Sequence, residues 1–422
     1  MRSLAMKTLV LVVIVVIIVA SIGVYYYYNY ASPSTTTTAT TATTTTTTTT
    51  SKPIKVAILF DVGGRGDLSF NDMAWLGAEK AVRDFNIQVE YTTPQSQAKM
   101  QDLLESLSAS GEYDLIVLVG FLWTSPLNAT ADKYPNQKYA LIDSSTFINR
   151  SNEVDILFSE QEVGALVGVL AADMASKIGC NKVGAVAGMS IPPLWRFHIG
   201  YLFGVKYYEM KTNKTIGFLW EYTSTFGDTQ KGYQYATSML QEGACVLYGL
   251  AGLTHVGMFD AVRDWNKQGK GVALAIGQDA SQEWYMPRYM PISGAKRVDI
   301  AVYDVIKMVV ENKWIPGIHV LGLKDGGVGI WDLDGVKYFA EIAYNQSKLE
   351  TGLTPNDVVR IVNETRNTYI TETGWSVMSE LEQLIISGQI AFKNPSTEDE
   401  YAQIVNALKN GDLNAALSKG SV

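Results

Sequence analysis

The sequence predicts an α/β protein of two similar lobes, each a doubly wound parallel sheet, preceded by an N-terminal membrane segment. Beyond residue 52, short apolar runs that end in glycine or a polar residue alternate with stretches of helical periodicity. This alternation occurs as two series joined by one long helical stretch, and repeated strand–helix units imply parallel sheets. A chain of 422 residues that is 47% hydrophobic is long enough for two domains of ordinary size.

The first 30 residues have the pattern of a membrane segment. Arg2 and Lys7 precede an uncharged run, residues 9–24, and four tyrosines follow it, which predicts a segment whose N-terminus lies inside. Its length lies between that of a cleaved signal core and that of a full span. We therefore expect an uncleaved anchor, with a cleaved signal peptide as the alternative. No cysteine lies near its end, which excludes lipidation of the bacterial lipoprotein type.

Residues 31–53 form a Thr/Ser-rich linker that cannot build a core and would lift the rest of the chain off the membrane. Matches to the N-glycosylation sequon fit a glycosylated surface protein, although each is weak alone. The sequon asparagines are Asn128, Asn149, Asn213, Asn345 and Asn363.

Residues 55–85 read as a buried strand, a glycine-rich turn and an amphipathic helix. Ser69 with Asp72 three residues later has the pattern of a capping box. Asp61, Asp67, Phe70 and Asn71 therefore gather at the carboxyl end of the first strand. In open parallel sheets, ligands bind at that end.

The remaining elements complete two lobes, residues 54–157 and 158–284, to which parts of 285–320 and 320–422 return. A helix over residues 160–178 joins the two series, and a later helix is expected over 295–311. This is the architecture of a type I periplasmic-binding-protein fold, with a hinge and a ligand cleft. The expected strands are residues 55–60, 87–91, 114–120, 138–143, 155–159, 182–188, 215–220, 244–250, 272–278, 319–323 and 327–330.

The strand ends should converge on the cleft, and they carry aromatic rings and carboxylates but few cations. Such a set suits a neutral, flat, hydroxylated ligand, since rings can stack on it and carboxylates can accept its hydrogen bonds. It suits a phosphate poorly, because phosphate favours Arg, Lys or a helix N-terminus. The strand-end residues are Asp61, Gly120, Phe121, Leu122, Trp123, Asp143, Gly188, Met189, Trp220, Thr225, Phe226, Gly227, Asp228, Ala251, Gly252, Gln278 and Asp279.

Each of these side chains also has a structural interpretation. Asp61 and Asp143 can cap turns, and Phe70, Phe226 and Trp220 can belong to the core. Lys296 can be an exposed lysine on a helix, and His255 is expected to be structural.

Charge and cysteine usage exclude several classes of protein. A net charge of −8 without a basic stripe makes nucleic acid an unsuitable partner. Cys180, Cys245 and three scattered histidines have no metal-ligand spacing, so we expect neither a metal nor a cofactor. The two cysteines can form a disulfide or remain separate buried thiols.

The motif DVGGRGDLSFND and an ordered series of later motifs resemble the basic membrane protein family. The series includes SEQEVGALVGVLAA, KVGAVAGMSIPPLWRF, FGDTQKG, IGQDASQ, SGAKRVDIAVYD and LGLKDGGVGI, and the resemblance spans residues 55–392. Members of that family are solute-binding proteins of ABC transporters, and the best-known ones are receptors for purine nucleosides.

The resemblance implies a role for each matching residue. Asp61 and Asn71 would hydrogen-bond the ligand, Phe70 and Phe226 would sandwich a purine, and Asp279 with Lys296 would face ribose. Phe121 and Gly252, at strand ends, complete the expected ligand-binding set. The sequence departs from the family at Ser281, where a second Asp is common, and at His255, which replaces a glycine. The loop around Ser125 also has no acidic residue to read a base.

We therefore expect an extracytoplasmic, membrane-tethered binding protein, not an enzyme, that delivers a nucleoside-like solute to an ABC permease and its ATPase. Two alternatives stay open. One is a tethered sensor ectodomain for another small solute, which a single N-terminal anchor permits. The other is a nucleoside-hydrolase-like enzyme, because Asp61 with Asp67 is faintly similar to the metal sites of such enzymes.

Overall fold

The computed structural model describes residues 52–420. The predicted membrane segment, residues 1–30, and nearly all of the Thr/Ser-rich linker lie outside the described residues. Within residues 52–420, no helix combines the length and the apolar character needed to cross a bilayer.

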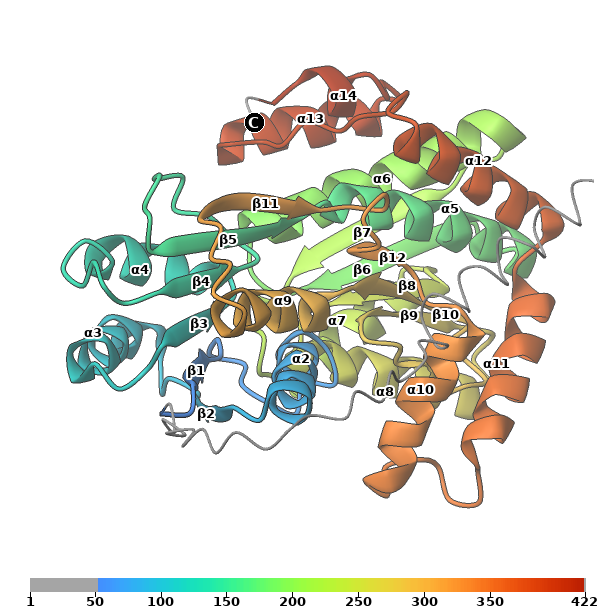
Figure 1. Ribbon diagram of the computed structural model, residues 1–422. Coiled ribbons are helices and arrows are strands. Elements are labelled where there is room, and N and C mark those ends of the chain that lie inside the picture. Colours follow the sequence, from blue (N-terminus) through green and yellow to red (C-terminus); the bar gives the residue numbers. More distant parts are fainter. Residues whose placement is uncertain (1–51, 421–422) are drawn as a thin grey trace, which may run out of the picture. The chain divides into compact units, whose positions relative to one another are not determined.

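The first sheet is made entirely of parallel strands, in the order β11-β5-β4-β3-β1-β2 (Figure 1). β1, β3 and β4 are apolar runs that are almost wholly buried, as expected for strands covered on both faces. The bounds are β1 Lys55–Leu59, β2 Gln88–Thr92, β3 Leu115–Val119, β4 Tyr139–Ile142, β5 Glu153–Phe158 and β11 Gly317–Leu321.

The second sheet repeats this order as β12-β10-β9-β8-β6-β7, with one antiparallel pair at its edge, β10 with β12. β4 of the first sheet and β9 of the second thus occupy equivalent places. The bounds are β6 Lys182–Ala187, β7 Gly217–Tyr222, β8 Val246–Leu250, β9 Leu274–Asp279, β10 Ile292–Lys296 and β12 Val328–Ile330.

Helices cover both faces of each sheet (Figure 1). In the first lobe α2 packs against α9, and in the second α5 packs against α6 and α7 against α8. The bounds are α2 Phe70–Phe85, α3 Met100–Ser110, α4 Thr124–Thr130, α5 Glu160–Ile178, α6 Pro192–Thr212, α7 Thr229–Gln241, α8 Leu253–Lys267, α9 Val298–Val310, α10 Leu333–Asn345, α11 Pro355–Tyr369, α12 Glu372–Ile386, α13 Glu398–Lys409 and α14 Ala415–Ser418, with short 3₁₀ turns at Gln97–Lys99, Phe121–Trp123 and Glu283–Tyr285.

Glycines allow α5 and α6 to approach backbone to backbone. A Cβ on Gly168 would lie 2.3 Å from the carbonyl oxygen of Tyr201, and a Cβ on Gly204 would lie 2.0 Å from that of Ala165. Any side chain there would force the helices apart. These positions therefore set how closely the middle turns of α5 and α6 pack together.

The chain passes between the lobes three times, and hydrogen bonds tie the three crossings together. The Ser159 N–H donates to the carbonyl oxygen of Leu321 at 3.1 Å, and the Arg297 N–H donates to that of Gly327 at 2.8 Å. Three short adjacent segments of this kind form a hinge about which lobes can close. α5 begins at Glu160, directly after one crossing, and β10 ends at Lys296, directly before another.

Three local predictions are wrong. Ser69 is the N-cap of α2 but makes no side-chain capping bond, because its hydroxyl lies against the second lobe and Asp72 accepts from the Gly66 and Leu68 amides instead. Lys296 ends strand β10 rather than lying in a helix, and α9 begins only at Val298. Trp220 is not at a strand end facing the cleft, because its ring stacks on His198 within the second lobe.

Cys180 and Cys245 form a disulfide, with 6.1 Å between their Cα atoms, so of the two possibilities left open by the sequence the bonded one is present. It ties the end of α5 to the start of β8, because Cys180 follows α5 and Cys245 precedes β8.

Candidate functional site

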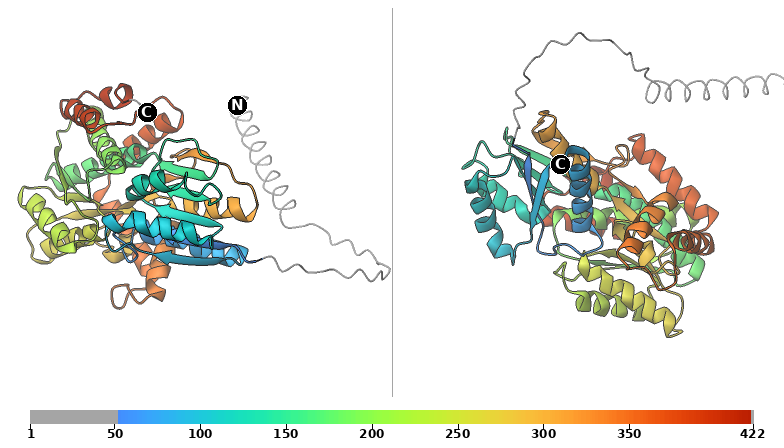
Figure 2. Two further views of the ribbon diagram at one scale, coloured as in Figure 1. Left: turned by 90° about the vertical axis from the view of Figure 1, so that its left-hand side faces the viewer. Right: turned by 60° about the horizontal axis from the view of Figure 1, so that its bottom comes forward.

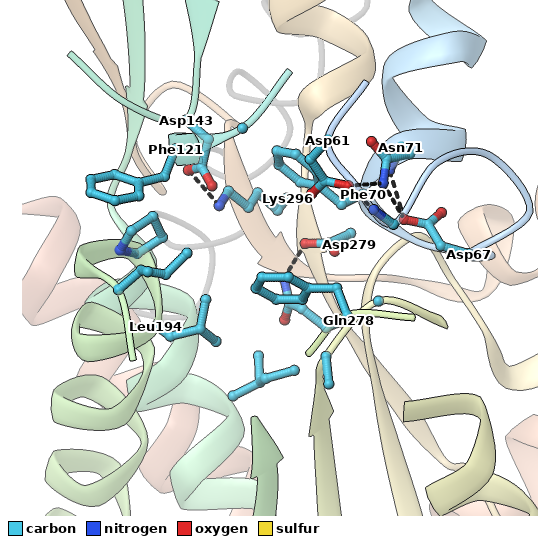
Figure 3. Close-up of a pocket in the computed structure, with 18 of the residues that line it drawn as sticks. Asp61, Asp67, Phe70, Asn71, Phe121, Asp143, Leu194, Gln278, Asp279 and Lys296 are labelled. Atoms are coloured by element: carbon cyan, nitrogen blue, oxygen red, sulfur yellow. Dashed lines mark hydrogen bonds and ion pairs between the residues drawn. The ribbon is translucent and has the colours of Figure 1, made fainter. Parts of the chain in front are cut away.

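A pocket lies between the two sheets where their strand ends meet (Figure 3). It encloses roughly 650 Å³ of space that protein atoms do not fill, part of it open to solvent. All eight residues that the sequence analysis assigned to ligand binding line it, namely Asp61, Phe70, Asn71, Phe121, Phe226, Gly252, Asp279 and Lys296.

On the first-lobe wall, one amide joins two buried carboxylates. The Asn71 Nδ2 donates to Asp61 Oδ1 and to Asp67 Oδ2, each at 3.0 Å. Because both of these partners are acceptors, the orientation of the amide is fixed. The Asn71 Oδ1 is then a buried acceptor without a hydrogen-bond partner among the described residues.

Within residues 52–420, neither Asp61 nor Asp67 has a cationic partner. Burial raises the pKa of Asp61, and the Asn71 amide and the Gly63 and Gly64 N–H groups oppose that rise. Burial and the neighbouring Asp72 raise the pKa of Asp67 to about 8, although backbone N–H groups donate to it. Asp61 and the Asn71 Oδ1 thus present acceptors on this wall, whereas Asp67 keeps its proton at neutral pH.

Opposite this wall, Lys296 is the centre of a buried cluster of charges. Its Nζ lies 2.6 Å from Asp143 Oδ1 and 2.8 Å from Glu160 Oε1 (Figure 3 shows the first pair). Glu160 in turn accepts from the Arg196 Nε at 2.5 Å. The cluster joins β4, the hinge and α6, so its charges depend on both lobes.

The charges in this cluster act differently on its members: Glu160, Arg196 and Lys296 are kept ionised, whereas burial raises the pKa of Asp143 well above its usual value although Lys296 opposes the rise. Burial opposes the ionisation of Glu160, but Arg196 and Lys296 outweigh it and lower its pKa to about 2. Burial alone would lower the pKa of Lys296, yet Asp143 and Glu160 raise it. The ammonium of Lys296 is thus paired, and it is not a free charge for an anionic ligand.

Asp279, the last residue of β9, connects the two lobes. Its Oδ2 accepts from the Ser69 hydroxyl at 2.5 Å, and its Oδ1 accepts from the Gln278 Nε2 at 3.1 Å. Burial raises its pKa, and Lys296 opposes the rise. The Trp331 Nε1 donates to the backbone oxygen of Asp279 at 2.9 Å, which fixes the strand end.

Glycines make room for the aromatic rings of the pocket. A Cβ on Gly188, at the end of β6, would lie 2.2 Å from the ring of Phe226, so this ring rests directly on the backbone. A Cβ on Gly120 would lie 3.5 Å from the ring of Phe70. Phe70 comes from the first lobe and Phe226 from the second, so a ring from each lobe faces the pocket.

Sequence reasoning missed the apolar wall at the start of α6. This wall consists of Ile191, Pro193, Leu194 and Phe197. The signal was present, since two prolines after a strand mark a helix start, where proline is favoured. Met189, just before this wall, packs on the first-lobe cluster that contains Leu122 and Trp123. The two lobes therefore make an apolar contact beside the pocket.

Two of the three departures noted in the sequence, His255 and Ser281, make buried hydrogen bonds. The His255 Nδ1 accepts from the Ala251 N–H at 3.1 Å, and its Nε2 lies 2.9 Å from the Gln282 amide nitrogen. The buried Ser281 hydroxyl donates to Glu283 at 2.6 Å. Ser125 is exposed and is not among the residues that line the pocket. Across residues 52–420, no three His, Cys, Asp or Glu side chains are grouped so as to hold a metal ion.

A family model described as ABC transporter substrate-binding protein, PnrA-like, matches residues 54–359. In a crystal structure of an ABC transporter solute-binding protein from Aeropyrum pernix K1, the chain is 54% identical to ours, with a TM-score of 0.85. That match covers 87% of this chain and all of the other.

Curated relatives agree with the family match. A protein of Pyrococcus abyssi named uncharacterized lipoprotein is 65% identical over 88% of this chain and 92% of its own length. The ABC transporter nucleoside-binding protein BmpA of Lactococcus lactis is 29% identical over 66% of this chain and 81% of its own length.

Proposed function

Because the chain belongs to the PnrA-like family of ABC transporter substrate-binding proteins, we propose that its pocket takes a nucleoside, and in the first place a purine nucleoside. The family consists of solute-binding proteins and not of enzymes, so the pocket is expected to release its ligand unchanged. The nucleoside is the finer part of the proposal, and it rests on the chemistry of the pocket and on the name of the Lactococcus relative.

The observation that carries the proposal is the pairing of two aromatic rings with carboxylates and no free cation. Phe70 and Phe226 give the pocket one ring from each lobe, which suits a flat base. Among the described residues that line the pocket, Lys296 is the one cation, and two carboxylates already pair with it. Buried carboxylates would therefore repel a phosphate group, whereas a neutral nucleoside carries no charge for them to repel.

Each end of a nucleoside has suitable partners. On the first-lobe wall, Asp61 and the unpartnered Asn71 Oδ1 can accept from N–H groups of a base, and a buried acceptor gains most from such a donor. Near the hinge, Asp279 can accept from ribose hydroxyls while Lys296 donates to a ribose oxygen. Phe121 and Gly252 would shape the pocket around the ligand.

The lobes would close over the ligand, and the closed protein would deliver it to a permease and its ATPase at the extracytoplasmic face of the membrane. The relatives from Pyrococcus are named lipoproteins, but this sequence has two cysteines and both form the disulfide. No cysteine is left to carry a lipid. We therefore propose that the apolar run near the N-terminus, residues 9–24, tethers this protein instead.

A thermal-shift screen of the full chain tests the proposal. The protein is heated with purine nucleosides, pyrimidine nucleosides, free bases, sugars and amino acids, and the mixtures are then analysed for reaction products. A ligand at 100 times its Kd adds about 2.7 kcal/mol to the free energy of unfolding, which such a screen detects. Stabilisation by a purine nucleoside without product formation supports the proposal, and stabilisation by another class alone overturns it.

A further inference from the structure

The family match ends at residue 359, yet the chain continues through three more helices, α12, α13 and α14. α12 packs on α5, and α13 packs on α6. Figure 2 shows these C-terminal helices, in red, lying against the green helices α5 and α6. They form a further layer on the second lobe, outside the helices that flank the cleft.

One side chain of this layer, Tyr401 on α13, reaches the start of α6. It is 9% exposed, and its ring stacks on Trp195 with centroids 5.3 Å apart and planes 13° apart. Its hydroxyl lies 2.6 Å from the His198 Nδ1 and 2.9 Å from the Tyr222 hydroxyl. A buried hydroxyl with two partners is a rigid contact, because breaking it leaves buried polar atoms unpaired.

The residues that Tyr401 holds alternate with residues that line the pocket. Leu194 and Phe197 are three apart and face the cleft, whereas Trp195 and His198 are three apart and face Tyr401. In these two turns of α6, one face therefore lines the pocket and the other face contacts α13. A shift of Tyr401 would be passed to the apolar wall of the pocket through a packed helix.

The C-terminal segment also makes a contact next to the buried charge cluster of Lys296, Glu160 and Arg196. Arg196 lies in these turns and pairs with Glu160, which pairs with Lys296. Beside Glu160, the Gln161 Nε2 donates to the Asn394 Oδ1, in the segment that leads to α13. The C-terminal segment thus contacts the first turns of both α5 and α6. Those of α6 line the pocket, and Glu160 at the start of α5 pairs with Lys296, which also lines it.

We propose that Tyr401 is a positioning residue for the ligand pocket, so that the C-terminal helices beyond the family match set the position of the α6 wall rather than only covering the second lobe. The proposal concerns the pocket whichever small solute fills it. Tyr401 itself does not line the pocket; it acts through Trp195 and His198.

The test compares Tyr401→Phe with Tyr208→Phe in the full chain. The first substitution removes the hydroxyl that contacts His198 and Tyr222 but keeps the ring on Trp195. The second removes the hydroxyl of another buried tyrosine in the far part of α6, where Tyr208 donates to Asp173 at 3.1 Å. Both variants lose buried hydrogen bonds, two in Tyr401→Phe and one in Tyr208→Phe, so both are expected to lose thermal stability.

Two measurements separate positioning from stability. Hydrogen exchange of the ligand-free protein follows the amides of residues 191–199, and calorimetry gives the Kd for inosine. In Tyr401→Phe, exchange in these residues should rise and the binding of inosine should weaken about three- to tenfold in Kd, an effect of the size of a single hydrogen bond. Tyr208→Phe should change neither.

Equal exchange and equal Kd in the two variants would show that the C-terminal helices only stabilise the lobe, and would overturn the proposal. If the wild-type protein does not bind inosine, the nucleoside assignment is tested separately with other solutes. The exchange comparison still decides the role of Tyr401, because it needs no ligand.

Discussion

Asp143 and Asp279 occupy equivalent places in the two lobes, and both have a backbone φ of 72°. Asp143 directly follows β4 and Asp279 ends β9, strands that hold the same place in the order of their sheets. Left-handed backbone at a residue other than glycine is uncommon and costs energy, and such residues cluster at functional sites. Here the turns bring one carboxylate from each lobe toward Lys296.

This relationship explains why Lys296 can be buried. Asp143 is in direct contact with its ammonium, and Asp279 acts on it through its charge. The electrostatic environment of the Lys296 ammonium therefore depends on carboxylates from both lobes. The following predictions test how this geometry binds a ligand and stabilises the fold.

Gly188→Ala should displace the ring of Phe226. The new methyl would lie 2.2–2.9 Å from three ring atoms, so the ring must leave the Gly188 backbone. Loss of one stacking face should weaken ligand binding by about 1–3 kcal/mol, measured by calorimetry. Gly227→Ala is the matched control, because its methyl would meet no atom within 4 Å. Equal affinity of the two variants would contradict a stacking role for Phe226.

Asp279→Ala should weaken the binding of a nucleoside more than that of its free base. Its carboxylate is assigned to ribose hydroxyls, and hydrogen bonds to a charged group contribute about 1.5–3 kcal/mol. Titrations with inosine and with hypoxanthine measure both affinities in one variant. If both affinities fall by the same factor, Asp279 does not face the ribose.

Stability should fall as the pH rises toward 8, most clearly above about pH 6.5, because the buried His198 and His255, whose pKa values burial lowers, oppose the fall at lower pH. The pKa of Asp67 is raised to about 8 and that of Asp155 to about 7, both mainly by burial, whereas an unfolded Asp titrates near 3.9. The folded state thus keeps protons that the unfolded chain has released. This contribution is complete below about pH 4 and is lost as the pH passes the folded pKa values.

Guanidinium unfolding at several pH values measures this slope, and Asp155→Asn supplies the control. Asp155 lies outside the pocket, where its Oδ2 accepts from the Ser145 hydroxyl at 2.6 Å while its Oδ1 has no partner among residues 52–420. The variant should lose less stability between about pH 6.5 and 8. A stability that increases across this range would contradict the prediction.

Reduction of the disulfide should lower the stability of the second lobe. Cys180 and Cys245 are 65 residues apart, and chain entropy gives such a cross-link about 4 kcal/mol. The guanidinium midpoint should fall when dithiothreitol is added. The double variant Cys180→Ser, Cys245→Ser should have the lower midpoint with or without the reductant, whereas a wild-type midpoint that ignores the reductant would refute the estimate.

Local sequence patterns predicted the strands, the long helix α5 and the strand ends that line the pocket. These features depend on periodicity and on the position of a residue after an apolar run, both of which are local. The patterns could not place Ser69, because its hydroxyl contacts Gln278 and Asp279, more than 200 residues away and in the other lobe.

The same reason accounts for Lys296 and Trp220. The helix expected over residues 295–311 takes in the last two residues of β10, since only pairing with β9 and β12 defines this short strand. Trp220 lies on β7 at the edge of the sheet, where its half-buried ring contacts His198 and Tyr222. Residues close in the sequence predict neither the strand partners of β10 nor the ring contact of Trp220 with His198.

The central claim is that the pocket holds a neutral purine nucleoside between the lobes. Calorimetric titration of the full chain with inosine and with its 5′-monophosphate tests it most directly. The account predicts saturable binding of inosine, which Gly188→Ala weakens and Gly227→Ala does not, and much weaker binding of the monophosphate, which would meet paired charges and uncompensated carboxylates. Equal or tighter binding of the monophosphate would contradict the account, and so would the absence of binding by any purine nucleoside.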